Sequence, residues 1–168
     1  MPSSLSHAMA AVAIGAAMAP KTPWRPLVIT GAVCAMVPDL DALPRLFGGH
    51  DIAALGGHRG FTHSITFAVL GGLVVAPWWK DGRGRVFAYI FLATLSHGVL
   101  DAFSNFGRSA GVAFLMPFAA TRFSAPWQPI RSELTEFVWC LAPLTCLAWL
   151  ALRIRGIRSP RGGHAPPH

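Results

Sequence analysis

The chain has 168 residues, the size of one domain, and 53% of them are hydrophobic while only 12% are charged. This balance is unusual for a soluble globule of that length and favours a membrane protein. A formal net charge of +7 would also suit a nucleic-acid-binding protein. The basic residues gather in short loops and in the tail, however, as they do in cytoplasmic loops of membrane proteins. We therefore expect membrane lipid and no nucleic acid as a partner.

Five apolar segments follow one another along the chain, each of roughly bilayer-spanning length, with the first slightly short. They predict an all-α fold, an integral membrane helical bundle with about five transmembrane helices. The first segment lacks the basic start of a signal peptide and carries His7, so we expect a retained helix. Residues 1–158 are assigned to one helical, hydrolase-like membrane domain and residues 159–168 to a disordered tail. The five segments are 5–19, 26–43, 62–79, 86–103 and 134–153.

Threading these segments back and forth places two kinds of polar residue on opposite faces of the membrane. Short basic loops belong in the cytoplasm. We therefore predict a multi-pass inner-membrane protein with its N-terminus outside, its C-terminus in the cytoplasm, and the long loops 44–61 and 104–133 outside. The basic face holds Lys21, Arg25, Lys80, Arg83, Arg85, Arg153, Arg155 and Arg158, and the opposite face holds His7, Asp39, Asp41, His58, His63, His97 and Asp101.

The fourth segment ends with a histidine and an aspartate four residues apart, His97 and Asp101. On a helix they would share one face, one turn from each other. Both residue types are common zinc ligands, so the pair could bind one metal ion, or Asp101 could orient a ligating His97. The alternative is a buried hydrogen bond that only ties helices together.

Two carboxylates, Asp39 and Asp41, follow Pro38 at the end of the second segment. Carboxylates this close repel each other unless a proton or a cation lies between them, which suits a bridging ligand in a two-metal site. The alternative is a solvated helix end. Asp39 is the candidate ligand of the two, and Asp41 is the first choice for a general base.

Two further histidines, His58 and His63, lie around the start of the third segment. A spacing of five does not suit two ligands on one regular helix, so one of them is expected on the preceding loop. Thr62 or Ser64 can cap the following helix. Arg59 could clamp an anionic substrate such as a phosphate and is assigned a catalytic role; the alternative is an arginine that snorkels to the headgroups.

His7, near the start of the first segment, is a candidate ligand with a weak signal of its own. Five crossings bring it to the same face as the other candidates. The set predicts one or two divalent ions, with zinc as the expected metal. The candidate metal ligands are His7, Asp39, His58, His63, His97 and Asp101, and the candidate catalytic residues are Asp41 and Arg59.

In these motifs the chain resembles the YdjM-type family of inner-membrane, metal-dependent hydrolases. That family is placed near the zinc-dependent phospholipase C and P1-nuclease group, which is all-helical with a histidine and aspartate metal cluster. The further histidine and glutamate of that group have no counterpart, because Glu133 and Glu136 have no histidine near them. The matching stretches are Ser6-His7, Pro38 to Asp41, His58 to Ser64, Ser96 to Asp101, Met116-Pro117-Phe118, Arg122-Phe123 and Pro129-Ile130. The ligands that the resemblance implies are His7, Asp39, His63, His97 and Asp101, with Asp41 and His58 as further candidates.

The expected function is a membrane-bound metal-dependent hydrolase that cleaves a phosphoester of a lipid or lipid-linked headgroup at the extracytoplasmic face. The substrate class follows from location, because a site at the membrane interface meets headgroups first. Two alternatives remain open. One is a membrane protein that handles metals or other ions, and the other is a non-catalytic helical protein with a structural histidine and aspartate cluster. The sequence assigns no oligomeric state.

Overall fold

The computed structural model describes residues 3–18, 24–50, 52, 55–104 and 111–158. Within these residues the regular secondary structure is helical, and the only β contacts are two isolated bridges, which confirms the all-α class. The expected tail, 159–168, and Lys21 lie outside the described residues. The elements are α1 (Ser4–Met18), α2 (Trp24–Met36), η1 (Val37–Ala42), α3 (Leu43–Leu46), η3 (Phe61–His63), α4 (Ile65–Val75), η4 (Ala76–Trp78), α5 (Arg83–Ala102), α6 (Glu133–Glu136), η5 (Phe137–Leu141) and α7 (Ala142–Arg158).

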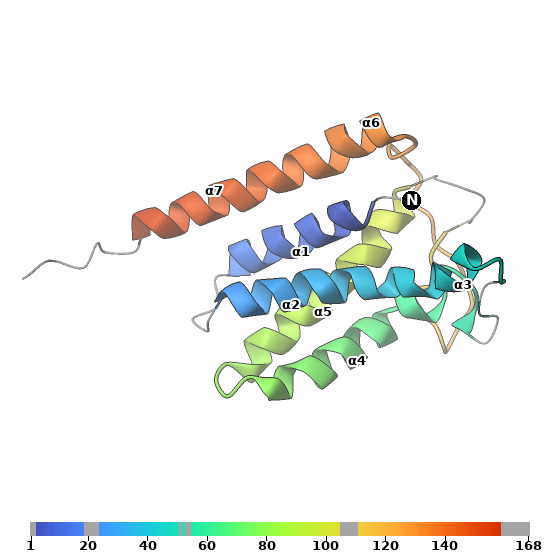
Figure 1. Cartoon of the computed structure of the whole chain (residues 1–168), viewed down its shortest axis with the longest axis horizontal. Coiled ribbons are helices and arrows are strands. Elements are labelled where there is room, and N and C mark those ends of the chain that lie inside the picture. Colours follow the sequence, from blue (N-terminus) through green and yellow to red (C-terminus); the bar gives the residue numbers. More distant parts are fainter. Residues whose placement is uncertain (1–2, 19–23, 51, 53–54, 105–110, 159–168) are drawn as a thin grey trace, which may run out of the picture.

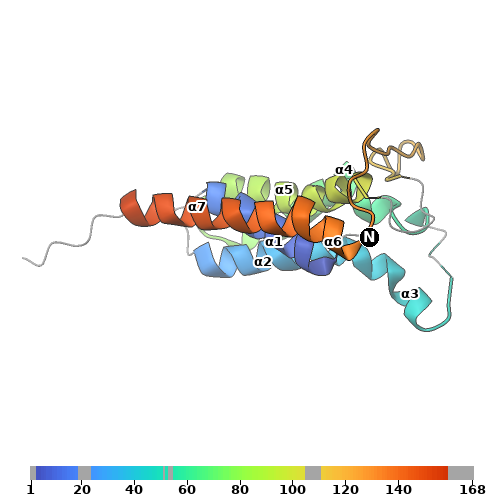
Figure 2. The same cartoon turned by 90° about the horizontal axis from the view of Figure 1, so that it is seen from above.

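The long helices run alternately in opposite directions, so the bundle has two distinct ends (Figure 1). One end holds the N-terminus, α3 and the start of α6, and the other holds the turn between α4 and α5 and the end of α7. Helix α7 packs along the outside of α1 (Figure 1). Figure 2 shows the bundle elongated along its helices, with α3 and the loops gathered at the N-terminal end. The helices thus match the five predicted apolar segments in position and in alternating direction.

Small residues allow the helices to approach closely. Tyr89 of α5 is 1% exposed, and its hydroxyl donates a hydrogen bond to the Ala11 carbonyl at 3.1 Å. A Cβ at Gly31 of α2 would lie only 2.2 Å from that hydroxyl oxygen, so the contact requires glycine at this position. Close packing through small residues is typical of helices in membranes, where lipid removes the usual hydrophobic drive for association.

The outer surface of the bundle is strongly apolar. Ile29 is 65% exposed, Val74 66% and Leu147 57%, whereas soluble monomers rarely expose large contiguous apolar surfaces. By length and composition, one helix of the described chain, Glu133–Ala151, could cross a membrane, while Ser4–Met18 and Ile65–Trp78 are apolar but shorter. The prediction of about five crossings is therefore not confirmed and stays a prediction.

The local sequence explains how the polar motifs come to lie at helix ends. Pro38 stands in the first turn of η1, where it has no amide to donate, and the chain tightens from α2 into a 3₁₀ helix there. This turn carries Asp39 and Asp41. Ser64 caps α4 by accepting a hydrogen bond from the Phe67 amide at 3.1 Å, as one of the two predicted caps.

Candidate metal centre

The eight candidate residues meet at the N-terminal end of the bundle. Direct contacts of 4.0 Å or less join all of them into one cluster. Seven are almost fully buried, and Asp39 is the exception, with a side chain that is 19% exposed. His50 is exposed and lies outside the cluster. The cluster consists of His7 on α1, Asp39 and Asp41 on η1, His58 and Arg59 on the loop before η3, His63 on η3, and His97 and Asp101 on α5.

Two imidazole nitrogens face each other at the centre of the cluster. The Nε2 atoms of His63 and His97 are 3.0 Å apart. Nδ1 of His97 lies 2.7 Å from the Ala35 carbonyl oxygen, which can only accept, so this nitrogen carries the proton. In a neutral His97 ring, Nε2 therefore presents a lone pair toward His63.

The same argument fixes the ring of His63. The Thr62 hydroxyl has one proton, which it donates to Asp41 Oδ2 at 2.6 Å. Thr62 Oγ1 is also 2.9 Å from His63 Nδ1, so this nitrogen must be the donor. The Nε2 atom of His63 then presents a lone pair as well. Two lone pairs 3.0 Å apart repel each other unless a cation or a proton lies between them.

His58 is oriented in the same way. Its Nδ1 is 2.6 Å from Asp41 Oδ1, and an ionised carboxylate only accepts, so Nδ1 donates and Nε2 keeps its lone pair. All three histidines thus donate Nδ1–H to a protein acceptor. Metal-binding histidines nearly always show this pattern, because the second hydrogen bond fixes the ring and raises the basicity of the ligating nitrogen.

Carboxylate oxygens surround the facing nitrogens at separations that suit shared coordination. Asp101 Oδ2 is 3.2 Å from His63 Nε2 and 3.8 Å from His97 Nε2, and Asp39 Oδ1 is 3.4 Å from His97 Nε2. Atoms that each lie about 2.1 Å from one zinc ion are at most about 4.2 Å apart. The atoms of His63, His97 and Asp101 therefore fit one ion by distance, while Asp39 belongs to overlapping groups with His97 and with His63. Both oxygens are buried without a hydrogen bond.

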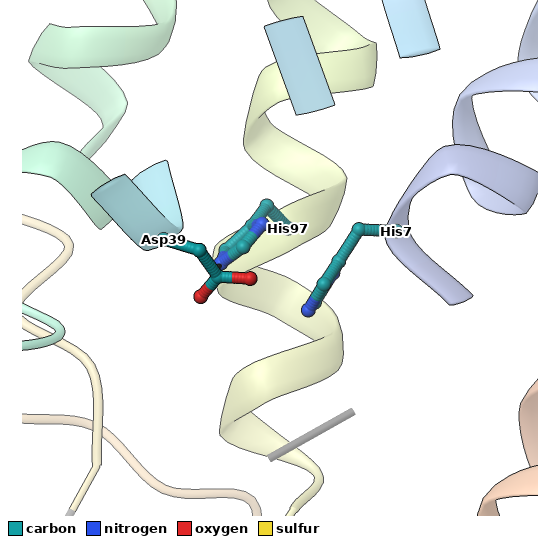
Figure 3. Close-up of side chains that lie close together, drawn as sticks. All are labelled: His7, Asp39 and His97. Carbon is teal, nitrogen blue, oxygen red and sulfur yellow. Dashed lines mark ion pairs between the residues drawn. The ribbon is translucent and has the colours of Figure 1, made fainter. Parts of the chain in front are cut away.

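His7 completes the wall of the cluster from α1. Its ring stacks on that of His97 with centroids 3.7 Å apart, and Nε2 is 4.0 Å from Asp101 Oδ1. Both of its ring nitrogens are buried without a hydrogen-bond partner. Figure 3 shows His7, Asp39 and His97 pointing toward one another from three elements. A buried imidazole with no partner is costly, and a bound metal ion would satisfy one of the two nitrogens.

The cluster also contains more negative than positive formal charge, which favours a bound cation. Three buried or half-buried carboxylates, on Asp39, Asp41 and Asp101, face one guanidinium, on Arg59. With neutral histidines, two negative charges remain uncompensated, and a divalent ion would balance them. Three overlapping groups have ligand atoms within 4.8 Å of one another: His7 with Asp39 and His97, Asp39 with His58 and His63, and His63 with His97 and Asp101.

Arg59 is buried behind Asp101 rather than exposed at the protein surface. Its Nε is 3.1 Å from Asp101 Oδ2, and Nη2 donates to Asp101 Oδ1 at 3.3 Å and to Ser104 Oγ at 2.8 Å. Its backbone φ of 62° is left-handed, which is uncommon outside glycine. Because the side chain is fully buried, the alternative interpretation, in which Arg59 snorkels to the lipid headgroups, is wrong. The observed contacts favour a residue that positions Asp101, and the predicted substrate clamp has no further support from them.

Asp41 likewise has both oxygens engaged. Oδ1 accepts from His58 and Oδ2 accepts from Thr62, at 2.6 Å each. Asp41 is absent from the groups that could hold a metal, whereas His58 is present in one of them. These contacts favour His58 as the ligand and Asp41 as its positioning residue, while the predicted general-base role stays untested.

The sequence did not reveal the role of several residues that position the side chains of the cluster. Thr62 was considered only as a cap, although its hydroxyl sets the ring of His63. Glu136 accepts hydrogen bonds from the hydroxyls of Ser3 and Ser6, which pins α6 to the first turn of α1 beside His7. Gly98 was also overlooked; a Cβ there would lie 2.7 Å from the His63 carbonyl oxygen. Polar residues beside the histidine motifs were the available signal for the hydroxyls, but nothing local pointed to Glu136.

Comparison with known proteins places the chain in a family. It matches the model of the YdjM inner membrane protein family over residues 1–162. It is also 36% identical over 138 residues to the inner membrane protein YbcI of Escherichia coli (strain K12), a match that covers 78% of this chain and 76% of that protein. No solved structure matches the chain. The chain therefore belongs to the YdjM family of inner membrane proteins, with a buried histidine and aspartate cluster at one end of its helical bundle.

Proposed function

We propose that this protein is a membrane-bound metal-dependent hydrolase that cleaves a phosphoester of a lipid or lipid-linked headgroup at the extracytoplasmic face. One observation carries the proposal: the Nε2 atoms of His63 and His97 lie only 3.0 Å apart. Their Nδ1 atoms are both committed to protein acceptors, so a cation or a proton must lie between the two Nε2 atoms. The three carboxylates that face a single guanidinium favour a divalent cation.

The donor set fits zinc. Histidine nitrogens and carboxylate oxygens are its usual ligands in hydrolytic sites. A divalent ion held there would make a water more acidic and would stabilise negative charge developing on a phosphoryl oxygen. The chain's own residues hold the set in place: Asp41 and Thr62 orient His58 and His63, and Arg59 holds Asp101.

The observations disfavour the two alternatives. A protein that ties its helices with histidine and aspartate pairs should satisfy those groups, yet both His7 nitrogens and one oxygen each of Asp39 and Asp101 make no hydrogen bond. A transporter usually carries ionisable groups near the bilayer midplane and paired repeats. Here the described ionisable residues gather at the ends of the bundle, and the sequence has no visible repeat.

Elemental analysis of detergent-purified protein tests the metal directly. We expect stoichiometric zinc or a similar divalent metal in the wild type, and loss of metal in His97→Ala and in Asp39→Ala. His50→Ala removes an exposed histidine outside the cluster and should keep full occupancy. Full occupancy in both ligand variants would favour the non-catalytic alternative.

Headgroup release tests the chemistry. The wild type, loaded with metal and reconstituted in phospholipid vesicles, should release a phosphorylated or free headgroup, and His97→Ala should release none above background. A wild type that holds metal but cleaves no phospholipid or lipid-linked phosphoester would contradict the hydrolase and favour a metal-handling protein.

Reporter fusions test the orientation, because the extracytoplasmic placement depends on it. A reporter fused after Ile157 should report a cytoplasmic location, and one inserted near Gly49 should report the opposite side. Two reporters on the same side would contradict the five-crossing arrangement and the placement of the centre outside.

A further inference from the structure

We infer that an apolar pocket beside Asp39 binds a hydrocarbon chain of the phospholipid substrate, so that the lipid reaches the metal centre sideways from the bilayer. The inference rests on the proposed function, because it names the part of the substrate that this pocket holds. It adds a binding site that the metal cluster itself does not define.

The pocket lies where α2 passes into η1 and α3. It has a volume of about 400 Å³, within the range of about 300–1,000 Å³ typical of small-molecule sites. Val33 and Met36 contribute from α2, Leu40 from η1 and Leu43 from α3, and Ser4 closes it from α1. No basic side chain lines it, so it suits an apolar chain better than an anion or a polar backbone.

Asp39 joins this pocket to the metal centre. It is the only carboxylate in the pocket lining, and its Oδ1 is 3.4 Å from His97 Nε2 without a hydrogen bond. The other candidate residues are almost fully buried, whereas the Asp39 side chain is 19% exposed. The pocket and the centre therefore share one wall, and that wall is the least covered part of the centre.

An exposed apolar stripe leads along α2 to the pocket. Ile29 is 65% exposed, Val33 56%, Met36 39% and Leu40 54%. The spacing of four and three residues places Ile29, Val33 and Met36 on one side of α2, and Leu40 follows on η1 in the pocket lining. A lipid whose chain lies along this stripe would bring its phosphoryl group to η1, next to Asp39. This continuity with the centre is why we assign the pocket to a substrate chain.

Photo-labelling tests the pocket independently of turnover. The probe is phosphatidylglycerol with a diazirine on one acyl chain, in vesicles of phosphatidylethanolamine and phosphatidylglycerol that contain the zinc-loaded protein. We expect labelling of residues 33–43 to exceed that of α4, which also faces outward with Leu73 57% exposed. Met36→Trp fills the pocket, and excluding even one methylene corresponds to about a fourfold loss of binding. Leu73→Trp is the matched control and should leave the labelling of residues 33–43 unchanged.

The outcomes separate the inference from the proposed function. Uniform labelling of α2 and α4, or labelling of residues 33–43 that Met36→Trp leaves intact, overturns the pocket. A protein–protein crosslink at these residues in place of lipid also overturns it and indicates a second copy of the chain. Selective labelling without headgroup release supports the pocket and contradicts the hydrolase. If Met36→Trp loses its zinc, Val33→Phe serves as the second variant, and the wild-type labelling pattern still decides.

Discussion

The two ends of the helical bundle hold most of its polar residues but treat charge in opposite ways. At the N-terminal end, the carboxylates, the guanidinium and the four imidazoles of the candidate metal centre are almost all buried against one another. At the other end, Arg25, Lys80 and Arg83 are exposed. The hydrogen bond of Arg83 is local, because its Nε donates to the Trp79 carbonyl at 3.1 Å, four residues away.

This difference in burial separates charges that the fold must stabilise from charges that it can leave in contact with solvent. Burying a charge costs several kcal/mol unless it is paired, so a buried cluster persists only when its members satisfy each other or bind a ligand. An exposed basic loop has no such cost and contributes little to stability. A mutation at the metal centre should therefore lower the free energy of unfolding much more than a mutation at the basic end.

Removal of Asp101 should have the largest effect. Asp101→Ala leaves Arg59 buried without its partner, and we expect a loss of about 3–5 kcal/mol in the free energy of unfolding, with loss of metal. Thermal unfolding in detergent measures the first and elemental analysis the second. Asp81→Ala, in the exposed turn at the other end, should change stability by less than about 0.5 kcal/mol. Equal stability of the two variants would contradict the buried pair.

Asp41→Asn should weaken metal binding by about 10–100-fold, because an amide has one acceptor oxygen whereas the carboxylate uses two, one for His58 and one for Thr62. Competition with a chelator of known affinity measures the change. Glu133→Gln makes the same chemical change at an exposed position and should leave the affinity unaltered. Normal metal affinity combined with lost headgroup release would instead support Asp41 as the general base.

Arg59→Lys keeps the charge but loses the two-pronged contact with Asp101. If Arg59 positions Asp101, metal affinity should fall about tenfold. If Arg59 clamps the substrate, metal content should stay normal while kcat/KM for headgroup release falls. Arg131→Lys is the control, since Arg131 is exposed and its Nε donates only to a nearby carbonyl, that of Gln128.

The smallest effect is expected at the basic end. Arg83→Ala removes one exposed hydrogen bond to the Trp79 carbonyl, so the free energy of unfolding should change by less than about 0.5 kcal/mol. Metal content should stay at the wild-type level. A loss as large as that of Asp101→Ala would mean that the basic end also contains a structural charge cluster.

Much of this arrangement could be predicted because it depends on local patterns. Apolar runs marked the long helices together with the short helical elements that continue them, η1 after α2 and α6 and η5 before α7. The spacing of His97 and Asp101 placed them on one face of α5. Alternation of helix direction then brought the candidate ligands to one end. The ion pair between Arg59 and Asp101 could not be predicted in this way, because its two members are 42 residues apart and belong to different elements.

The sequence by itself determined the helical class, the family and the set of residues that could bind a metal, because hydropathy, helical period and motif strings are properties of neighbouring residues. Only the tertiary structure decided what each residue does within that set. Which nitrogen of His63 faces the centre depends on Thr62 and Asp41 together. His7 lies on α1, and Glu136 holds the first turn of that helix from 130 residues away. Such roles follow from hydrogen-bond partners that meet only when the chain folds.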